Sequence, residues 1–211
     1  MSASTYIRDP DAIYAASFAT IRAEAGLERL PVSIAHVAER MIHACGMTDM
    51  VEDLLFSPDA AEAGRAALMA GAPVFCDAEM VRHGIIKRLL PNGNELVCMI
   101  GDESVAVRAK VISNTRSAAQ VDLWGTRLGG SIVAIGNAPT ALFRLLERID
   151  EGAPKPALIL GLPVGFVGAA ESKAELAADS RGVPFITLKG RRGGSAMAAA
   201  AVNALCTGWQ V

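Results

Sequence analysis

The fold is decided by one stretch of the sequence, Ser131-Ile132-Val133-Ala134-Ile135-Gly136-Asn137-Ala138-Pro139-Thr140. After Ser131 the run to Ile135 is apolar without polar alternation, which is typical of a strand buried on both faces of a parallel sheet. A loop of small residues follows, and Pro139 stands where proline is favoured, at the first position of a helix. The stretch therefore predicts a strand, a short loop and a helix in direct succession.

The same pattern extends outward in both directions. Further apolar runs are Pro73–Cys76, Leu96–Ile100, Ala157–Leu160 and Pro184–Leu188. Helical patterns separate most of them, at 115–128, 138–150, 171–180 and 195–206. Short apolar strands that alternate with helices predict a doubly wound, largely parallel sheet covered by helices on both faces. The predicted architecture is a three-layer α/β/α fold.

The first 70 residues predict a helical N-terminal segment. Asp9 is a suitable N-cap for a helix that begins at Pro10, and a second helix runs from Ser33 to Cys45. A short helix is expected from about Asp49, and an alanine-rich one opens at Ser57-Pro58. The pattern resumes directly after the Pro-containing stretch 151–156, so we expect one domain over residues 1–211.

Composition excludes several classes of function. No apolar run reaches the 18 or more residues of a membrane helix, and the first residues lack the apolar region of a signal peptide, so we expect a cytoplasmic protein. A net charge of −2 without a basic stripe argues against nucleic acid. The widely spaced Cys45, Cys76, Cys98 and Cys206 are expected to be small buried hydrophobes, and no metal-ligand spacing occurs.

Three loops that follow predicted strands are candidates for ligand binding: 136–140, 161–173 and 190–195. Their glycines allow close approach of the backbone, and helix starts present free N–H groups to an anion. Glycine and proline also punctuate ordinary connections, so a purely structural role stays open. The spacing of Gly161, Gly165 and Gly168 is not that of a dinucleotide fingerprint, and no P-loop occurs, which disfavours a nucleotide.

The helix from Ser33 to Cys45 holds a second candidate. His36, Arg40 and His43 lie at i, i+4 and i+7 and share one helix face, and Glu39 precedes His43 by four residues. Histidine exchanges protons near neutral pH, so this face suits proton transfer. The alternative is a solvated face with His43 packed near the helix end.

Two further sites have both a structural and a functional interpretation. Thr115 is a suitable N-cap, and Arg116 in the first helical turn opposes the helix dipole, which favours contact with a ligand. Asp77 and Glu79 are either paired acids or capping residues. Ser195 lacks the surroundings of a nucleophilic serine.

Several motifs, in order along nearly the whole chain, resemble the precorrin-8X methylmutase family. They are Tyr6–Asp9, Met41–Gly46, Cys76–Val81, Asn114–Ala118, Ala134–Leu142, Gly161–Lys173 and Gly190–Ala196. The resemblance implies an isomerase of cobalamin biosynthesis that moves a methyl group from C-11 to C-12 of precorrin-8X by a 1,5-sigmatropic shift, giving hydrogenobyrinic acid. It also implies a flavodoxin-like sheet, a homodimer, and no metal or organic cofactor.

The resemblance assigns the catalytic role to His43 in the motif Met41–Gly46. The substrate is a large anionic tetrapyrrole, and we expect its carboxylates to be held near the subunit interface. The expected substrate-binding residues are Ser17, Arg40, Thr115, Arg116, Ser117, Asn137, Gly165, Lys173, Arg192, Gly194 and Ser195. The motifs are closer to the aerobic branch than to the branch that acts on cobalt-precorrin-8. A non-catalytic tetrapyrrole carrier and a flavodoxin-like nucleotide binder are the alternatives.

Overall fold

The computed structural model describes residues 6–209 and contains a six-stranded sheet with the order β1-β6-β5-β4-β2-β3. The strands are β1 (Leu54–Phe56), β2 (Val74–Cys76), β3 (Leu96–Val97), β4 (Ile132–Ile135), β5 (Leu158–Gly161) and β6 (Phe185–Leu188). Strands β2 to β6 are mutually parallel, and their spatial order is that of a flavodoxin-like sheet. The prediction of a doubly wound, largely parallel sheet is confirmed.

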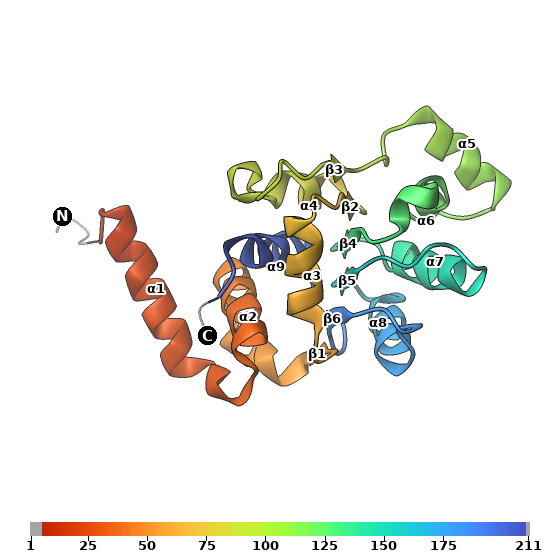
Figure 1. Ribbon diagram of the computed structural model, residues 1–211. Coiled ribbons are helices and arrows are strands. Elements are labelled where there is room, and N and C mark those ends of the chain that lie inside the picture. Colours follow the sequence, from red (N-terminus) through yellow and green to blue (C-terminus); the bar gives the residue numbers. More distant parts are fainter. Residues whose placement is uncertain (1–5, 210–211) are drawn as a thin grey trace, which may run out of the picture.

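Helices cover both faces of this sheet. They are α1 (Pro10–Glu24), α2 (Val32–Cys45), α3 (Ala60–Met69), α4 (Glu79–Gly84), α5 (Glu103–Val111), α6 (Arg116–Leu123), α7 (Pro139–Asp150), α8 (Ala169–Ala178) and α9 (Ser195–Thr207). Figure 1 shows α2, α3, α4 and α9 on one side of the strands and α6, α7 and α8 on the other, with α5 outside α6. The three predicted layers are therefore present.

Helix α7 shows how the sequence produces this packing. Its buried residues Leu142, Leu145, Leu146 and Ile149 lie at i, i+3, i+4 and i+7 and form one apolar face. That face packs into the same core cluster as Val133 of β4, while charged residues fill the outer face. A helix patterned in this way is stable only against the sheet, which fixes the start of α7 above the end of β4.

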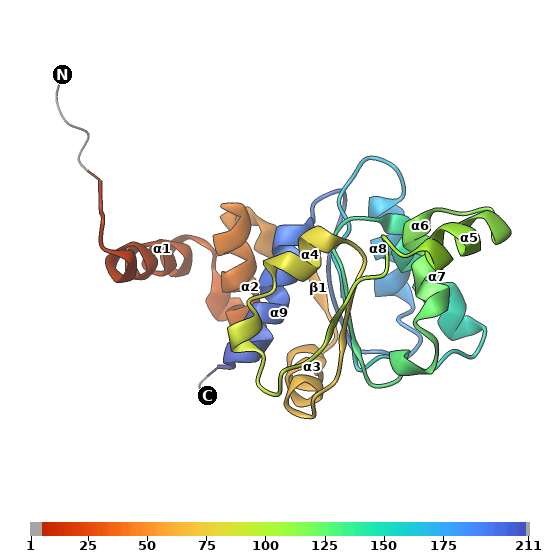
Figure 2. The ribbon, with the colours of Figure 1, turned by 90° about the horizontal axis from the view of Figure 1, so that it is seen from above.

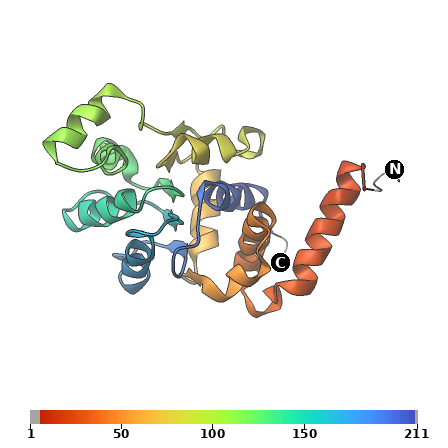
Figure 3. The same ribbon diagram turned by 180° about the vertical axis from the view of Figure 1, so that it is seen from behind.

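Helix α1 is packed differently from the others. Of its side chains only Phe18 and Ile21 are buried, while Ile13 and Tyr14 stay exposed. Figures 2 and 3 show it standing beside α2 at one end of the molecule, away from the sheet. Its N-terminus was predicted correctly, because Asp9 accepts a hydrogen bond from the Ala12 N–H at 2.8 Å. The exposed apolar side chains of α1 form a surface that another protein chain could cover.

The structure corrects the sequence interpretation in three regions. The segment expected to be a short helix from about Asp49 is a 3₁₀ helix over Thr48–Asp53 followed by β1, which pairs antiparallel with β6. Helices α4 and α5 were not predicted, and β3 ends at Val97 rather than Ile100. The helix predicted over 115–128 ends at Leu123, and a 3₁₀ turn starts at Gly125, whose φ is +57°. Strand β1 depends on pairing with a strand distant in the sequence, and the left-handed Gly125 follows the end of α6.

No helix in the described part of the chain is long and apolar enough to cross a membrane. The four cysteines carry free thiols, and Cys76 is fully buried in β2 while the other three are half-buried. The prediction that they are packed as small hydrophobes holds in full for Cys76 and in part for the others.

Candidate functional site

The three loops singled out in the sequence meet at the carboxyl edge of the sheet. The Gly194 N–H donates to the Leu162 carbonyl at 2.8 Å, and the Gly165 N–H donates to the Arg191 carbonyl at 3.2 Å. A side chain at Gly136 would place its Cβ 2.7 Å from the Ser195 Cα, so the third loop lies equally close. Small residues are needed at this edge because the backbones themselves are in contact.

Asp77 joins two of the strands at the point where the strand order reverses. Its fully buried carboxylate accepts hydrogen bonds from the N–H groups of Gly136, Asn137 and Ala138 at 2.9, 2.9 and 2.6 Å. Burial raises the pKa of the Asp77 carboxyl, and these hydrogen bonds oppose that effect. The backbone N–H groups of the loop between β4 and α7, at the switch point of the sheet, therefore bind a side chain of the protein itself.

This arrangement settles the two interpretations of Asp77 and Glu79. Asp77 binds the loop at 136–138 ahead of α7, and Glu79 forms an ion pair with Arg82 at 2.6 Å. They are not a pair of acids that share one task. The backbone N–H of Asn137, a predicted substrate contact, is already used by Asp77.

His43 lies in the last turn of α2, directly before the helix ends at Gly46. Its Nδ1 shares a hydrogen bond of 2.9 Å with the Ser17 hydroxyl of α1. The imidazole stacks on the Phe18 ring at a centroid distance of 5.0 Å and an interplanar angle of 15°. The guanidinium carbon of Arg40 lies 5.3 Å from the centroid of the same Phe18 ring. The structure thus brings together the three predicted residues Ser17, Arg40 and His43.

Two pockets open beside the His43 imidazole. One of about 260 Å³ is lined by Tyr14 and Arg40 and, from α9, by Ala196 and Asn203. The other, of about 270 Å³, includes Ser17. Because Nδ1 is bound to Ser17 and no residue in 6–209 hydrogen-bonds Nε2, that second nitrogen is the one presented to a ligand.

His36 belongs to a different place despite its position on the same helix face. Its Nε2 shares a hydrogen bond of 3.0 Å with the Thr207 hydroxyl, and it lines a separate pocket of about 600 Å³ with Trp209. Burial, and to a lesser extent the charge of Arg40, lower the pKa of His36. Glu39 does not assist His43 either, since its carboxylate lies 2.6 Å from Nε of Arg22.

The start of α6 lies next to the start of α7. Thr115 caps α6 as predicted, accepting from the Ala118 N–H at 3.1 Å, and its hydroxyl also shares a hydrogen bond of 2.7 Å with that of Thr140. Arg116 is exposed, and no carboxylate in the described residues forms an ion pair with it; Ser117 beside it is half-buried. Arg116 therefore keeps the free charge that a ligand contact requires.

Lys173 and Arg192 stabilise a loop in this structure. The Lys173 side chain is 1% exposed, and its ammonium donates to the carbonyl of Arg192. Burial lowers the pKa of Lys173 to about 8. The Arg192 guanidinium lies 2.7 Å from the carboxylate of Asp49 and 3.9 Å from that of Asp53. Both cations, predicted as substrate contacts, are thus engaged by the protein, and sequence reasoning missed the two aspartates that engage Arg192.

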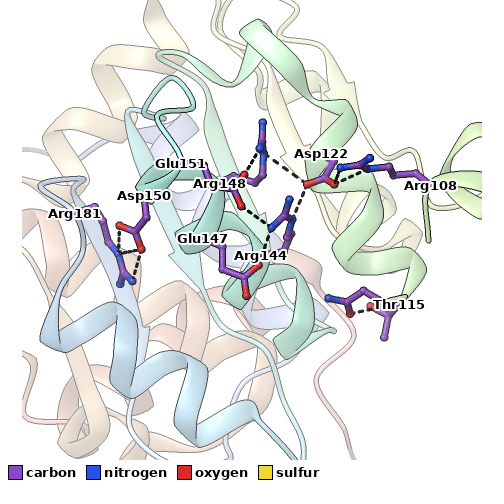
Figure 4. A network of polar contacts seen from close by, with 10 residues as sticks. Arg108, Thr115, Asp122, Arg144, Glu147, Arg148, Asp150, Glu151 and Arg181 are labelled. Atoms are coloured by element: carbon purple, nitrogen blue, oxygen red, sulfur yellow. Dashed lines mark hydrogen bonds and ion pairs between the residues drawn. The ribbon is translucent and has the colours of Figure 1, made fainter. Parts of the chain in front are cut away.

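A separate polar cluster covers the opposite face of the sheet (Figure 4). Asp122 of α6 accepts from Arg108 and from Arg144, each at 2.6 Å, and Arg148 lies 3.6 Å away. Burial alone would raise the pKa of the Asp122 carboxyl, but the hydrogen bonds from Arg144 and Arg108 together lower it. No local sequence pattern predicted this network of ion pairs.

No group of three or more histidines, cysteines, aspartates and glutamates suited to a metal ion occurs within residues 6–209. The fold and site together define a flavodoxin-like α/β protein with a histidine at a helix end and three glycine-containing loops in contact at the carboxyl edge of its sheet. Comparison with known proteins identifies the family. The model of the precorrin-8X methylmutase family matches residues 12–207, and the chain belongs to this family.

Relatives agree over nearly the full length. A precorrin-8X methylmutase from Pseudomonas aeruginosa is 62% identical over 96% of this chain and 97% of its own, and one from a Sinorhizobium species is 60% identical over 95% of both. A cobalt-precorrin-8 methylmutase from Priestia megaterium is 42% identical over 93% of this chain and 87% of its own.

The solved structure of a precorrin-8x methyl mutase from Thermus thermophilus superposes with a TM-score of 0.85 at 40% identity, covering 93% of this chain and 95% of that one. The resemblance seen in the sequence is confirmed, and the chain is an isomerase of the methylmutase type that functions in cobalamin biosynthesis. A non-catalytic carrier is not favoured.

Proposed function

We propose that the chain moves a methyl group from C-11 to C-12 of precorrin-8X to give hydrogenobyrinic acid, with His43 as the proton donor and acceptor. The observation that carries this proposal is the fixed orientation of the His43 side chain. Its Nδ1 is hydrogen-bonded to Ser17, and its ring is stacked on Phe18. An imidazole fixed at one nitrogen presents the other at a defined position, as a general acid requires.

The reaction itself asks little of the protein beyond this. In a 1,5-sigmatropic shift the methyl–C-11 bond breaks as the methyl–C-12 bond forms, and the electrons move within the conjugated ring. Protonation of a ring nitrogen by His43 redistributes the π electrons of the macrocycle in favour of the product. After the methyl group has moved, the same proton returns from the ring nitrogen to His43. The remaining acceleration comes from holding the macrocycle in the reactive geometry.

The acidic groups at the rim of the tetrapyrrole require positive charge at the site. Arg40, beside His43, and the exposed Arg116, at the start of α6, have no ion-pair partner in the described residues. We propose that both bind substrate carboxylates, through charge-assisted hydrogen bonds. The Ser117 hydroxyl, with Gly165, Gly194 and Ser195 of the edge loops, completes the binding surface.

We further propose that the active protein is a homodimer with the site near its interface. A pocket of about 260 Å³ is small for a tetrapyrrole, since sites for drug-sized ligands measure roughly 300–1,000 Å³. Helix α1 contributes Tyr14 to that pocket, and Ile13 of the same helix is exposed, as are Tyr6 and Ile7 ahead of it, so a second subunit would have apolar side chains to cover. Sedimentation at micromolar concentration is expected to show a dimer; a fully active monomer would reject this.

Two finer points follow from the comparisons and the thiols. The relatives named precorrin-8X methylmutase are nearer in sequence than the one named cobalt-precorrin-8 methylmutase, which supports a metal-free substrate. Free thiols at Cys45, Cys76, Cys98 and Cys206 fit a reducing compartment, which supports a cytoplasmic location.

The test of the proposal is the variant His43→Ala. We expect turnover of precorrin-8X to fall by roughly 10²- to 10⁴-fold, the usual contribution of a general acid, while hydrogenobyrinic acid still binds. The matched control is His36→Ala on the same helix, which lines a different pocket and is expected to keep full turnover. Near-normal turnover in His43→Ala would remove the histidine from the mechanism.

A further inference from the structure

The connection between β5 and α8 carries an exposed apolar tip that the site described above does not use. The side chains of Phe166 and Val167 are 86% and 89% exposed, and Val164 on the same loop is exposed as well. Single exposed apolar residues are ordinary on protein surfaces, but three of them gathered on one loop suggest a surface that is covered during function.

Arg191, from the loop between β6 and α9, lies against this tip. Its guanidinium carbon is 5.4 Å from the centroid of the Phe166 ring. The backbones of the two loops are joined there, since the Gly165 N–H donates to the Arg191 carbonyl at 3.2 Å. Phe166 and Arg191 therefore form one unit on two connected loops.

The charge of Arg191 is not neutralised by the protein. Within residues 6–209 no carboxylate forms an ion pair with it, whereas its neighbour Arg192 is paired with Asp49 at 2.7 Å. A guanidinium that rests its face near an aromatic ring keeps its N–H edge free for a carboxylate. Of the two arginines in the predicted loop, Arg191 is the one available to an anion.

The tip is bounded by glycines in conformations that other residues avoid. The φ angles are +147° at Gly165 and +79° at Gly168, so the four-residue tip at 165–168 turns at both ends without side-chain strain. Beneath it, Lys173 and the contacts of Gly193 hold the neighbouring loop close to Leu162. A loop tip that turns at two glycines above a fixed neighbouring loop has a geometry suited to holding a ligand.

We propose that Phe166 and Arg191 form a substrate clamp at the carboxyl edge, with Arg191 binding a rim carboxylate and Phe166 covering the apolar face of the macrocycle. The inference rests on the proposed function, because it takes its ligand from that reaction. An apolar surface alone would suit a second subunit equally well. The unpaired guanidinium within the same unit is what favours an anionic ring as the occupant.

The experiment titrates hydrogenobyrinic acid into the full-length wild type, Arg191→Gln and Phe166→Ala, at low and high salt. Each substitution is expected to raise Kd about 10-fold, the usual effect of losing one charged hydrogen bond or one aromatic contact. Only Arg191→Gln is expected to reduce the salt dependence, and kcat at saturating precorrin-8X should stay within a few-fold. The control Val111→Ser removes another exposed apolar side chain, on α5, and should leave Kd unchanged.

Unchanged Kd in both variants would overturn the clamp. It would leave the proposed function intact, because that is tested separately by the loss of turnover in His43→Ala. Sedimentation of the same variants decides the occupant. Dissociation of the dimer by Phe166→Ala, with unaltered product affinity per intact dimer, would assign the tip to a second subunit and overturn the proposal as well.

Discussion

Arginines on the two sides of the molecule are used in opposite ways. Among the outer helices, Arg108 of α5, Arg144 of α7 and Arg181, which follows α8, each form ion pairs with carboxylates of a neighbouring helix (Figure 4). At the carboxyl edge and beside His43, Arg40 and Arg191 rest on aromatic rings, and no carboxylate in the described residues pairs with them.

The difference shows how local positive charge persists in a protein with a net charge of −2. Carboxylates on the helical face neutralise the arginines there, and those ion pairs join α5, α6 and α7. Arg191 has no such partner in the described residues and lies in the loop after β6, while Arg40 lies beside His43 on α2. Local positive potential thus arises from the distribution of the partners rather than from an excess of basic residues.

The comparison is tested most strongly at the centre of the ion-pair network. Asp122 is 4% exposed in its side chain and lies between arginines of two helices. Asp122→Ala removes the carboxylate that Arg108 and Arg144 share, while Glu147 and Glu151 remain beside Arg144, so we expect the free energy of unfolding to fall by about 1.5–3 kcal/mol. Chemical denaturation measures it, and kcat of the folded protein should not change.

Acid titration gives a second readout of the same carboxylate. Because the pKa of Asp122 is lowered in the folded state, its stabilisation is present above the ordinary value of about 3.9 and is lost as the pH falls below it. The control is Glu147→Ala, which removes a 57% exposed partner of Arg144 and should cost little. A loss of activity without a loss of stability in Asp122→Ala would contradict the division into two regions.

Lys173 is a cation that fits neither group, because it is buried and bonded to a carbonyl instead of a carboxylate. With a folded pKa of about 8, against 10.5 normally, the folded state binds fewer protons than the unfolded state between these values. Stability therefore rises with pH in that window, by up to about 1.4 kcal/mol per pH unit.

We expect this rise in the wild type and its absence in Lys173→Met, so that the two unfolding free energies differ by a pH-dependent amount of roughly 3 kcal/mol across the window. Urea unfolding at pH 7, 9 and 10.5 measures the difference. If the plots of unfolding free energy against pH were parallel for the two proteins, the lowered pKa of Lys173 would be contradicted.

The smallest effect on stability is expected at Arg116. This exposed arginine lacks an ion pair in the described residues, so Arg116→Ala should change the unfolding free energy by no more than about 0.5 kcal/mol. Product binding should nevertheless weaken about 10-fold, because a charged hydrogen bond to the ligand is lost. Arg108→Ala on the neighbouring helix α5 is the matched control, with stability reduced and binding retained. An unaltered titration curve for Arg116→Ala would place it outside the site.

The sequence was sufficient for features that depend on neighbours along the chain. The strand, loop and helix of residues 131–150 and the caps at Asp9 and Thr115 were predicted correctly, because apolar periodicity and capping act over a few residues. Strand β1 was missed because three residues, Leu54–Phe56, become a strand only by pairing with β6, more than a hundred residues away in the chain.

The same limit applies to the candidate site. Whether Arg192 or Arg191 is free depends on Asp49, which no local pattern connects with the loop at residue 190. The burial of Lys173 likewise depends on how that loop folds over it. Spacing placed His36 and His43 on one helix face, but the hydroxyls of Thr207 and Ser17, from opposite ends of the chain, decide that they serve different pockets.

The carboxylate of Asp77 at the start of α7 has a consequence for how this enzyme rests between turnovers. In a flavodoxin-like protein that relies on a bound phosphate, the loops at this point lose their partner whenever the ligand departs. Here the anion is tethered to β2, so its effective concentration at the Gly136–Ala138 amides is the same whether the site is full or empty. The loop at 136–138 thus has a hydrogen-bond partner within the protein, and its position does not depend on an anion supplied by a ligand.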